Sequence, residues 1–206
     1  MKDKKILVIA TGNKHKFQEI TKIMDLKDWE VKFLKDFPEF EIPEETGKTY
    51  EENAFIKAKT CADKLKLPAL ADDSGLEVDA LGGEPGVYSS RYGGIEGDSK
   101  RNITRLLEEM NTIPEGKRTA KFICCSMLVF PDGFSHIEWG EVKGRITFKP
   151  SGTAGFGYDP IFIPDGYKNT FAELSPEEKN KISHRAIAFR KMADFLTHFS
   201  YEYCSS

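Results

Sequence analysis

Two adjacent carboxylates, Asp72 and Asp73, end the apolar run Ala69–Ala71 and are followed by Ser74-Gly75. Neighbouring residues of a strand point to opposite faces of a sheet, so the two side chains cannot do the same work if the strand continues through both. We expect the strand to end here, with Ser-Gly turning the backbone so that Asp73 reaches a cleft and Asp72 supports it from the other side. The alternative is local, with Asp73 bonding backbone N–H groups in an Asx-turn.

Two further carboxylates, Glu44 and Glu45, lie upstream in the acidic, proline-containing segment 36–47. Clustered carboxylates repel one another, and one of them takes up a proton unless a cation lies among them. Oxygen ligands without histidine or cysteine suit Mg²⁺ or Mn²⁺ and do not suit zinc. The acidic residues therefore favour a hard divalent cation as the partner of this group.

Residues 11–16, TGNKHK, form a polar turn between a β-branched apolar run and a helical pattern. Such a turn presents backbone N–H groups at the positive end of a helix, where an anion binds well. Lys14 and Lys16 oppose the helix dipole, which is unfavourable unless an anion lies nearby. An Asn-capped helix with solvated lysines explains the pattern equally well, and neither the GxxxxGK[ST] nor the GxGxxG motif is present.

A third polar group lies on the helix that begins after Thr49, where Thr49 and Glu52 form a capping box. Asn53 and Lys57 are four residues apart in this helix and therefore share a face. Together their amide and ammonium groups could reach a phosphate. A solvated helix face is the alternative explanation of the same spacing.

The segment 152–160, GTAGFGYDP, sets two large aromatic residues, Phe156 and Tyr158, between glycines. Flanking glycines let a ring stand free, as stacking on a flat ligand requires. A buried aromatic plug in a turn is the competing interpretation. Further along, 179–185, KNKISHR, places His184 and Arg185 at the start of a helix, where cations again oppose the dipole. This violation suggests a functional site, although a solvent-facing loop is also compatible with it.

The overall composition excludes several classes of protein. The 206 residues suit one compact domain, and 39% apolar with 31% charged residues is ordinary for a globular chain. A net charge of −3 argues against a protein that grips duplex nucleic acid. Cys61, Cys124, Cys125 and Cys204 lack metal-ligand spacing, so we expect free thiols. The short apolar run at the N-terminus predicts neither a signal segment nor a membrane span, and hence a cytoplasmic protein without a membrane partner.

Periodicity supplies the elements that must position these residues. Apolar runs predict strands, whereas apolar residues at helical spacing predict helices. We expect strands at 6–10, 31–34, 69–73, 118–130 and within 134–148, and helices near 14–24, 50–66, 99–110, 176–182 and 184–196. Helices and strands alternate early and the middle is rich in strands, which favours an α/β (α+β-like) domain with a mixed sheet.

Taken together and in this order, the segments resemble the inosine triphosphate pyrophosphatase family, which hydrolyses non-standard purine nucleoside triphosphates. The matching segments are TGNKHK, EETGKTYEENAFIKA, ALADDSGLEVDALGGEPGVYSSRY, GTAGFGYDPIF and EEKNKISHR. The resemblance implies one two-lobed domain over residues 1–206, with an elongated mixed sheet flanked by helices around a nucleotide cleft, and a homodimer. It also implies Mg²⁺-dependent cleavage between the α- and β-phosphates of inosine, deoxyinosine and xanthosine triphosphates, with Mn²⁺ as a substitute metal.

By matching position, the resemblance makes Asp73 the proton acceptor and a metal ligand, and Glu44 the second metal ligand, with Glu45 beside it as the alternative register. It assigns the substrate to Thr11, Gly12, Asn13, Lys14, His15, Lys16, Lys57, Ser74, Phe156, Gly157, Tyr158, Asp159, Lys179, His184 and Arg185. One departure is Ala154, where glycine is more usual, and it is tolerable unless the backbone there needs a positive φ.

Two other classes of function share part of the pattern. A non-catalytic purine nucleotide-binding or sensing module would keep the pocket, but binding alone does not need the carboxylate cluster. A phosphatase of small metabolites would use similar groups and release orthophosphate. We find no trustworthy Ser-His-Asp or Cys-His arrangement, so direct attack by water, oriented or deprotonated by Asp73, is the expected chemistry.

Overall fold

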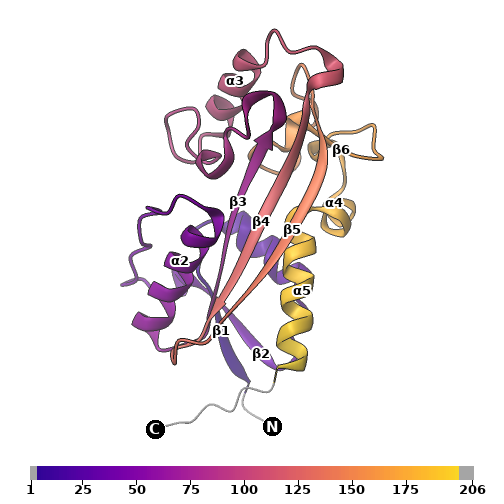
Figure 1. Ribbon diagram of the computed structural model, residues 1–206. Helices are drawn as coiled ribbons and strands as arrows, with labels where there is room; N and C mark the ends of the chain where they lie inside the picture. Colours follow the sequence, from indigo (N-terminus) through magenta and orange to yellow (C-terminus); the bar gives the residue numbers. More distant parts are fainter. Residues whose placement is uncertain (1–3, 200–206) are drawn as a thin grey trace.

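A six-stranded mixed sheet runs through the length of the molecule in the computed structural model, which describes residues 4–199 (Figure 1). Strand β1 pairs in parallel with β2 and β3, and the remaining neighbours pair antiparallel in the order β2-β1-β3-β4-β5-β6. This confirms the expected mixed sheet. The strands are β1 Lys5–Ile9, β2 Trp29–Phe33, β3 Ala69–Val78, β4 Thr119–Val129, β5 Ser135–Ile146 and β6 Phe162–Pro164.

Helices cover both faces of the lower half of the sheet (Figure 1). One face carries α2, and the other carries α1 and α5, while α3 lies over the upper end of the long strands. Along residues 4–199 no helix has the length and apolar character needed to cross a membrane. The helices are α1 Lys14–Ile23, α2 Tyr50–Leu65, α3 Ser99–Glu109, α4 Pro176–Ile182 and α5 His184–His198.

The capping signals read from the sequence are confirmed. The Thr49 hydroxyl accepts the N–H of Glu52, whose carboxylate accepts the N–H of Thr49, so the first turn of α2 is closed from both sides. Ser175 caps α4 through the N–H of Glu178, and Ser183 caps α5 through the N–H of Ala186. These caps fix where α2 and α5 begin, and both helices carry site residues in their first turns.

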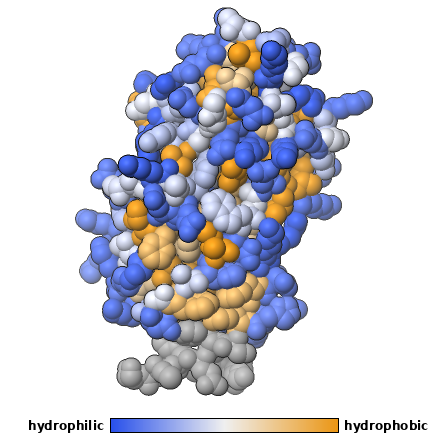
Figure 2. Space-filling model, in the orientation of Figure 1, coloured by the Kyte–Doolittle hydropathy of each residue, from blue (hydrophilic) through white to orange (hydrophobic). Residues whose placement is uncertain are grey.

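Three clusters of buried side chains divide the molecule into two lobes. Below, Leu7 and Leu70 pack against α1 and α5, whereas Val8 and Ala71 pack against the small residues of α2. Above, the last residues of β3 and the first residues of β4 pack against α3 and the aromatic residues around β6. The strands β3, β4 and β5 pass through both lobes, so the lobes share one continuous scaffold. Figure 2 shows that the outer surface of the face in view is mostly hydrophilic, with apolar residues in separate patches.

The expected turn at Ser74-Gly75 is wrong. Strand β3 continues to Val78 and stays in register with β4, pairing Asp72 with Ser126 and Asp73 with Cys125. Ladder hydrogen bonds to β4 outweigh the turn propensity of Ser-Gly. Gly75 serves close packing instead, because a Cβ there would overlap the carbonyl oxygen of Gly86 and lie 2.6 Å from the Tyr50 hydroxyl.

The cysteines behave as buried apolar residues. Cys61, Cys124 and Cys125 are free thiols inside the core, as expected, and burial raises the pKa of the Cys61 thiol to about 12. Thiols with raised pKa values carry little thiolate and react slowly. Cys204 lies outside the described residues.

Gly140 in β5 lets the first turn of α5 approach the sheet. A Cβ on Gly140 would overlap the carbonyl oxygen of His184 and lie 2.6 Å from the backbone nitrogen of Ala188. Because neither of these backbone atoms can rotate away, a side chain at Gly140 must displace the helix that carries His184 and Arg185.

Gly140→Ala should therefore lower the free energy of unfolding by about 1–3 kcal/mol through overpacking. Gly116→Ala is the matched control, since a Cβ there meets nothing within 4 Å, and it should leave stability unchanged or raise it by up to about 1 kcal/mol. Urea denaturation of both variants measures the difference, and equal effects would contradict the close-approach explanation.

Candidate active site

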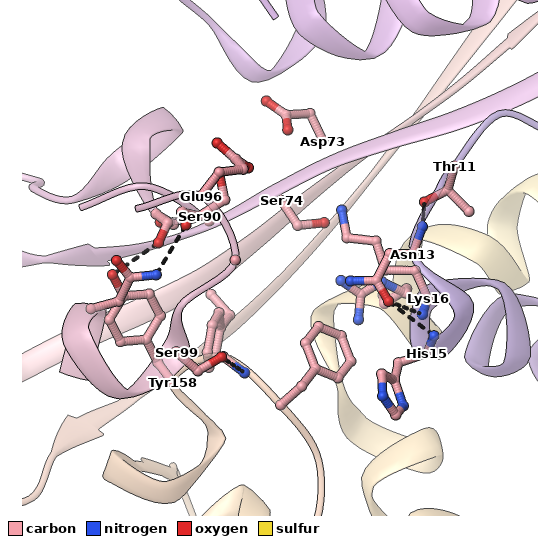
Figure 3. A pocket seen from close by; sticks show the side chains of 18 of the residues that line it. Thr11, Asn13, His15, Lys16, Asp73, Ser74, Ser90, Glu96, Ser99 and Tyr158 are labelled. Atoms are coloured by element: carbon pink, nitrogen blue, oxygen red, sulfur yellow. Dashed lines mark hydrogen bonds between the residues drawn. The ribbon is translucent and has the colours of Figure 1, made fainter. Parts of the chain in front are cut away.

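A cleft of about 490 Å³ opens between the two lobes, with walls from α1, α2, β3, α5 and the loop before β6 (Figure 3). It gathers residues from nearly the whole chain, from Ala10 to Arg185. The site residues predicted from the sequence that line it are Thr11, Gly12, Asn13, His15, Lys16, Lys57, Asp73, Ser74, Phe156, Gly157, Tyr158, Asp159, Lys179, His184 and Arg185.

Two predicted site residues, Lys14 and Glu44, do not line the cleft. Both side chains are exposed. Glu45 lies in the cleft instead, and its carboxylate is 2.5 Å from the Lys57 ammonium. Of the two neighbouring glutamates that the sequence offered, Glu45 is therefore the one positioned beside Asp73. Sequence spacing could not choose between them, because segment 36–47 has no periodic structure that fixes which side chain faces inward.

Asp73 faces α2 and is nearly buried. Its Oδ2 accepts a hydrogen bond from Asn53 at 3.2 Å, and its Oδ1 lies 3.4 Å from the Lys57 ammonium. Burial raises the pKa of Asp73 above its ordinary value, against the opposing effect of Lys57 and with help from Glu45. A carboxylate with a raised pKa accepts a proton more readily than a free one, which is what a general base needs.

Asp72 faces the opposite side, toward α1 and α5, as the alternation of a strand requires. Its Oδ2 is 3.0 Å from the Lys16 ammonium and 3.5 Å from Arg185 Nε, and it accepts a 2.8 Å hydrogen bond from the Ser74 hydroxyl. Burial alone would raise the pKa of Asp72, but the cations of Lys16, Arg185 and Lys57 outweigh it and hold the pKa far below its usual range. Asp72 therefore stays ionised and ties both helices to β3.

The open edge of β3 explains how one cleft reaches both faces of the strand. Pairing with β1 stops at Leu70, and the next backbone bridge on this edge joins Glu77 to Pro85, so the residues between them have a strand neighbour on the β4 side only. The N–H of Leu76 bonds the Ser89 hydroxyl and that of Val78 bonds Glu84, which shows that even-numbered residues direct backbone groups to this edge. The backbone groups of Asp72 and Ser74 point the same way by alternation, toward the cleft.

The TGNKHK turn is an Asn-capped helix start. Asn13 Oδ1 accepts the N–H groups of His15 at 2.9 Å and Lys16 at 3.2 Å, so the cap uses two of the donors that an anion would otherwise bind. Within residues 4–199, the N–H groups of Gly12 and Lys14 keep no such partner. Lys16 forms an ion pair with Asp72. This pairing explains why a lysine is tolerated at the positive end of a helix.

The two aromatic residues of segment 152–160 have different environments. Tyr158 is buried and donates a 3.0 Å hydrogen bond to the Ser89 carbonyl, so for this ring the plug interpretation holds. Phe156 is half-buried at the cleft, with the Lys179 ammonium 4.9 Å and the Arg185 guanidinium 5.3 Å from its ring centroid. Ala154 does not have a positive φ, so its backbone tolerates the methyl group, as expected.

Glu19 of α1 holds two cationic side chains of the cleft, Lys179 and Arg185, in place, and no sequence pattern pointed to this role. Its carboxylate binds the Lys179 ammonium at 3.0 Å and the Arg185 guanidinium at 2.6 Å. Lys179 also donates to Asp159 at 2.7 Å, and Asp159 accepts the N–H of Phe156 at 2.8 Å. Asp159 thus fixes the backbone at Phe156 and links it to Lys179.

Asn53 and Lys57 are not on a solvated helix face. Asn53 is fully buried and Lys57 nearly so, and Asn53 also accepts the N–H of Gly47, which ties the acidic loop to α2. The sequence feature that indicates this burial is the position of both residues directly beside the alanines of the buried face of α2. Ser89, Asn102 and Phe122 were not expected in the cleft and line it as well.

Comparison with known proteins identifies the family of this chain. The model of the Ham1 family matches residues 7–195. The chain belongs to the Ham1 family. A dITP/XTP pyrophosphatase of Geobacter sulfurreducens is 48% identical over 190 residues, covering 92% of this chain and 96% of the relative. The dITP/XTP pyrophosphatase of Bacillus cereus is 47% identical over 196 residues, covering 94% and 96%.

A solved structure of a Ham1 protein has the same fold as this chain. The Ham1 protein of Staphylococcus aureus superposes with a TM-score of 0.84 at 40% identity, covering 94% of this chain and 98% of that protein. The family resemblance inferred from the motifs and the expected fold class are therefore confirmed.

The buried imidazole of His184 should make the stability of the protein depend on pH. Burial, with Arg185 and Lys179 nearby, lowers the pKa of His184 well below 6.5. Above pH 6.5 the ring is neutral in both states, so its contribution to stability is complete. As the pH falls below 6.5 the unfolded chain binds a proton that the folded chain does not, and stability is lost.

We therefore expect the His184 ring to lower the free energy of unfolding of the wild type by up to about 2 kcal/mol as the pH falls from 7.5 to 5. In His184→Gln this part of the pH dependence should be absent. His198→Gln, which changes an exposed histidine of the same helix, should keep the wild-type dependence. Urea titrations at several pH values measure it, and a wild-type slope in His184→Gln would refute this assignment.

Proposed function

We propose that this chain is a Mg²⁺-dependent pyrophosphatase that hydrolyses inosine, deoxyinosine and xanthosine triphosphates to the nucleoside monophosphate and pyrophosphate. The observation that carries the proposal is the pair of adjacent carboxylates at an open strand edge, one kept ionised by cations and the other with a raised pKa. The dITP/XTP pyrophosphatase names of the relatives support it.

The base assignment follows from the surroundings of Asp73. Asp73 accepts the proton of the attacking water, and Asn53 and Lys57 hold its carboxylate in place. Charge that builds up on the phosphate oxygens is met by the ammonium groups of Lys16 and Lys57 and by the free N–H groups at the α1 start. Asp72 takes no part in proton transfer because its pKa is held too low.

The residues present fit a magnesium ion. Glu45 and Asp73 converge on one cation, the Lys57 ammonium, at 2.5 and 3.4 Å, so they already share a positive charge. Mg²⁺ is commonly held by one or two carboxylates together with substrate phosphates and water, and no larger cluster of His, Cys, Asp and Glu exists among residues 4–199. When bound there, the ion would stabilise charge on the phosphate oxygens. Mn²⁺ is expected to substitute.

The nucleobase is assigned to the opposite wall. Phe156 offers a ring for stacking, and Lys179, His184 and Arg185 offer hydrogen-bond donors beside it. Hypoxanthine and xanthine carry a 6-oxo acceptor where adenine carries a 6-amino donor, so a wall of donors favours the oxo bases. A homodimer remains a prediction from the family resemblance, and a cytoplasmic location remains a prediction from the short apolar run at the N-terminus.

Asp73→Asn tests the base directly. The amide keeps the shape of the side chain but cannot accept the proton, so kcat for inosine triphosphate should fall by at least about 10²-fold while the nucleotide still binds. Asp63→Asn, which changes a half-exposed aspartate of α2 that does not line the cleft, should retain wild-type rates. Steady-state kinetics with calorimetric binding decides the point, and a near-normal rate for Asp73→Asn would remove Asp73 from the mechanism.

Product identity and metal removal test the reaction class. Inosine triphosphate should yield inosine monophosphate and pyrophosphate, turnover should stop with a chelator, and added Mg²⁺ should restore it. Release of orthophosphate would favour a phosphatase, and binding without turnover would favour a sensing module. Equal rates on ATP would contradict the proposed choice of base.

A further inference from the structure

His184 lines the cleft, yet its ring makes no hydrogen bond to the part of the chain that the structure describes. The residue is 4% exposed, and Nδ1 is a buried ring nitrogen without a partner. Buried polar atoms are almost always paired, so an unpaired one calls for an explanation. Hydrogen bonds within the protein thus leave the orientation of this imidazole undetermined.

The ring of Phe122 supplies the missing constraint. It lies parallel to the imidazole, with ring centroids 4.7 Å apart and an angle of 8° between the planes. Phe122 is itself fixed by Phe162, whose ring is 4.7 Å away at 64°, and by Phe171 at 6.0 Å. The aromatic core of the upper lobe therefore sets the plane of a side chain at the start of α5.

The unpartnered Nδ1 also selects a tautomer. A neutral imidazole carries one N–H and one bare acceptor nitrogen. Buried N–H groups without an acceptor are rarer in proteins than buried acceptors without a donor, so the proton belongs on Nε2. With Nδ1 facing the interior, the Nε2–H edge is the polar group that His184 can offer to a ligand.

We propose that Phe122 is a positioning residue for the substrate, whose ring holds His184 so that Nε2–H points as a donor at an acceptor atom of the ligand. The acceptor class is an oxo oxygen, such as that at position 6 of hypoxanthine or xanthine. This inference rests on the proposed function for the identity of the ligand. Phe122 does not touch the reacting atoms and acts through His184.

The test compares Phe122→Leu with Phe162→Leu. Both variants remove one ring from the same aromatic cluster, but Phe162 neither stacks on His184 nor lines the cleft. Phe122→Leu should lower kcat/KM for inosine triphosphate by about tenfold, through KM, as expected for the loss of one oriented hydrogen bond. Phe162→Leu should lose comparable stability in urea and keep kcat/KM within about twofold. Phe122→Tyr, which retains the ring, should keep the wild-type KM.

A double-mutant cycle isolates the path through His184. In a His184→Ala background, Phe122→Leu should cause no further change in KM, because the group that it orients is gone. An undiminished effect in that background, or an equal loss in Phe162→Leu, would overturn the positioning role. Wild-type turnover with an unchanged Phe122→Leu variant overturns this inference alone. A wild-type chain that neither binds nor hydrolyses inosine triphosphate overturns it together with the proposed function.

Discussion

The two-residue period of a β-strand is the constraint on which this site depends. Because β3 stays extended through Asp72 and Asp73, adjacent carboxylates must face opposite sides of the sheet. One meets the helix that carries Lys57, and the other meets the helices that carry Lys16 and Arg185. A single short segment thereby serves two different electrostatic environments, and the strand keeps the distance between them constant.

Those environments divide the work between the two acids. Placing charges in a low-dielectric interior is costly unless each one is paired. Asp72 is paired with two cations, and its charge is a fixed part of the scaffold. Asp73 shares one ammonium with Glu45, which leaves less positive charge for each carboxylate and explains the opposite directions of the two pKa shifts. Pairs of acids whose pKa values are driven apart are typical of acid–base sites.

Local rules predicted the elements well, and tertiary contacts decided the rest. Caps at Thr49, Ser175 and Ser183 were legible because they depend on neighbours within four residues. The continuation of β3 through Ser-Gly was not, because it depends on β4, about fifty residues away. The role of Glu19 was hidden for the same reason: its partners Lys179 and Arg185 are 160 and 166 positions distant. The separate environments of Phe156 and Tyr158 likewise follow from contacts with other segments.

The open edge of β3 has a consequence for the behaviour of the folded chain toward other chains. Unpaired strand edges are templates for intermolecular pairing, and proteins usually protect them with charges, prolines or covering loops. Here the unpaired stretch lies along a cleft between two lobes, and its residues are buried apart from the half-buried Ser74, so it is not an edge on the outer surface. The same unpaired backbone groups that would promote aggregation on an outer surface are thus available to a small ligand and shielded from a second strand.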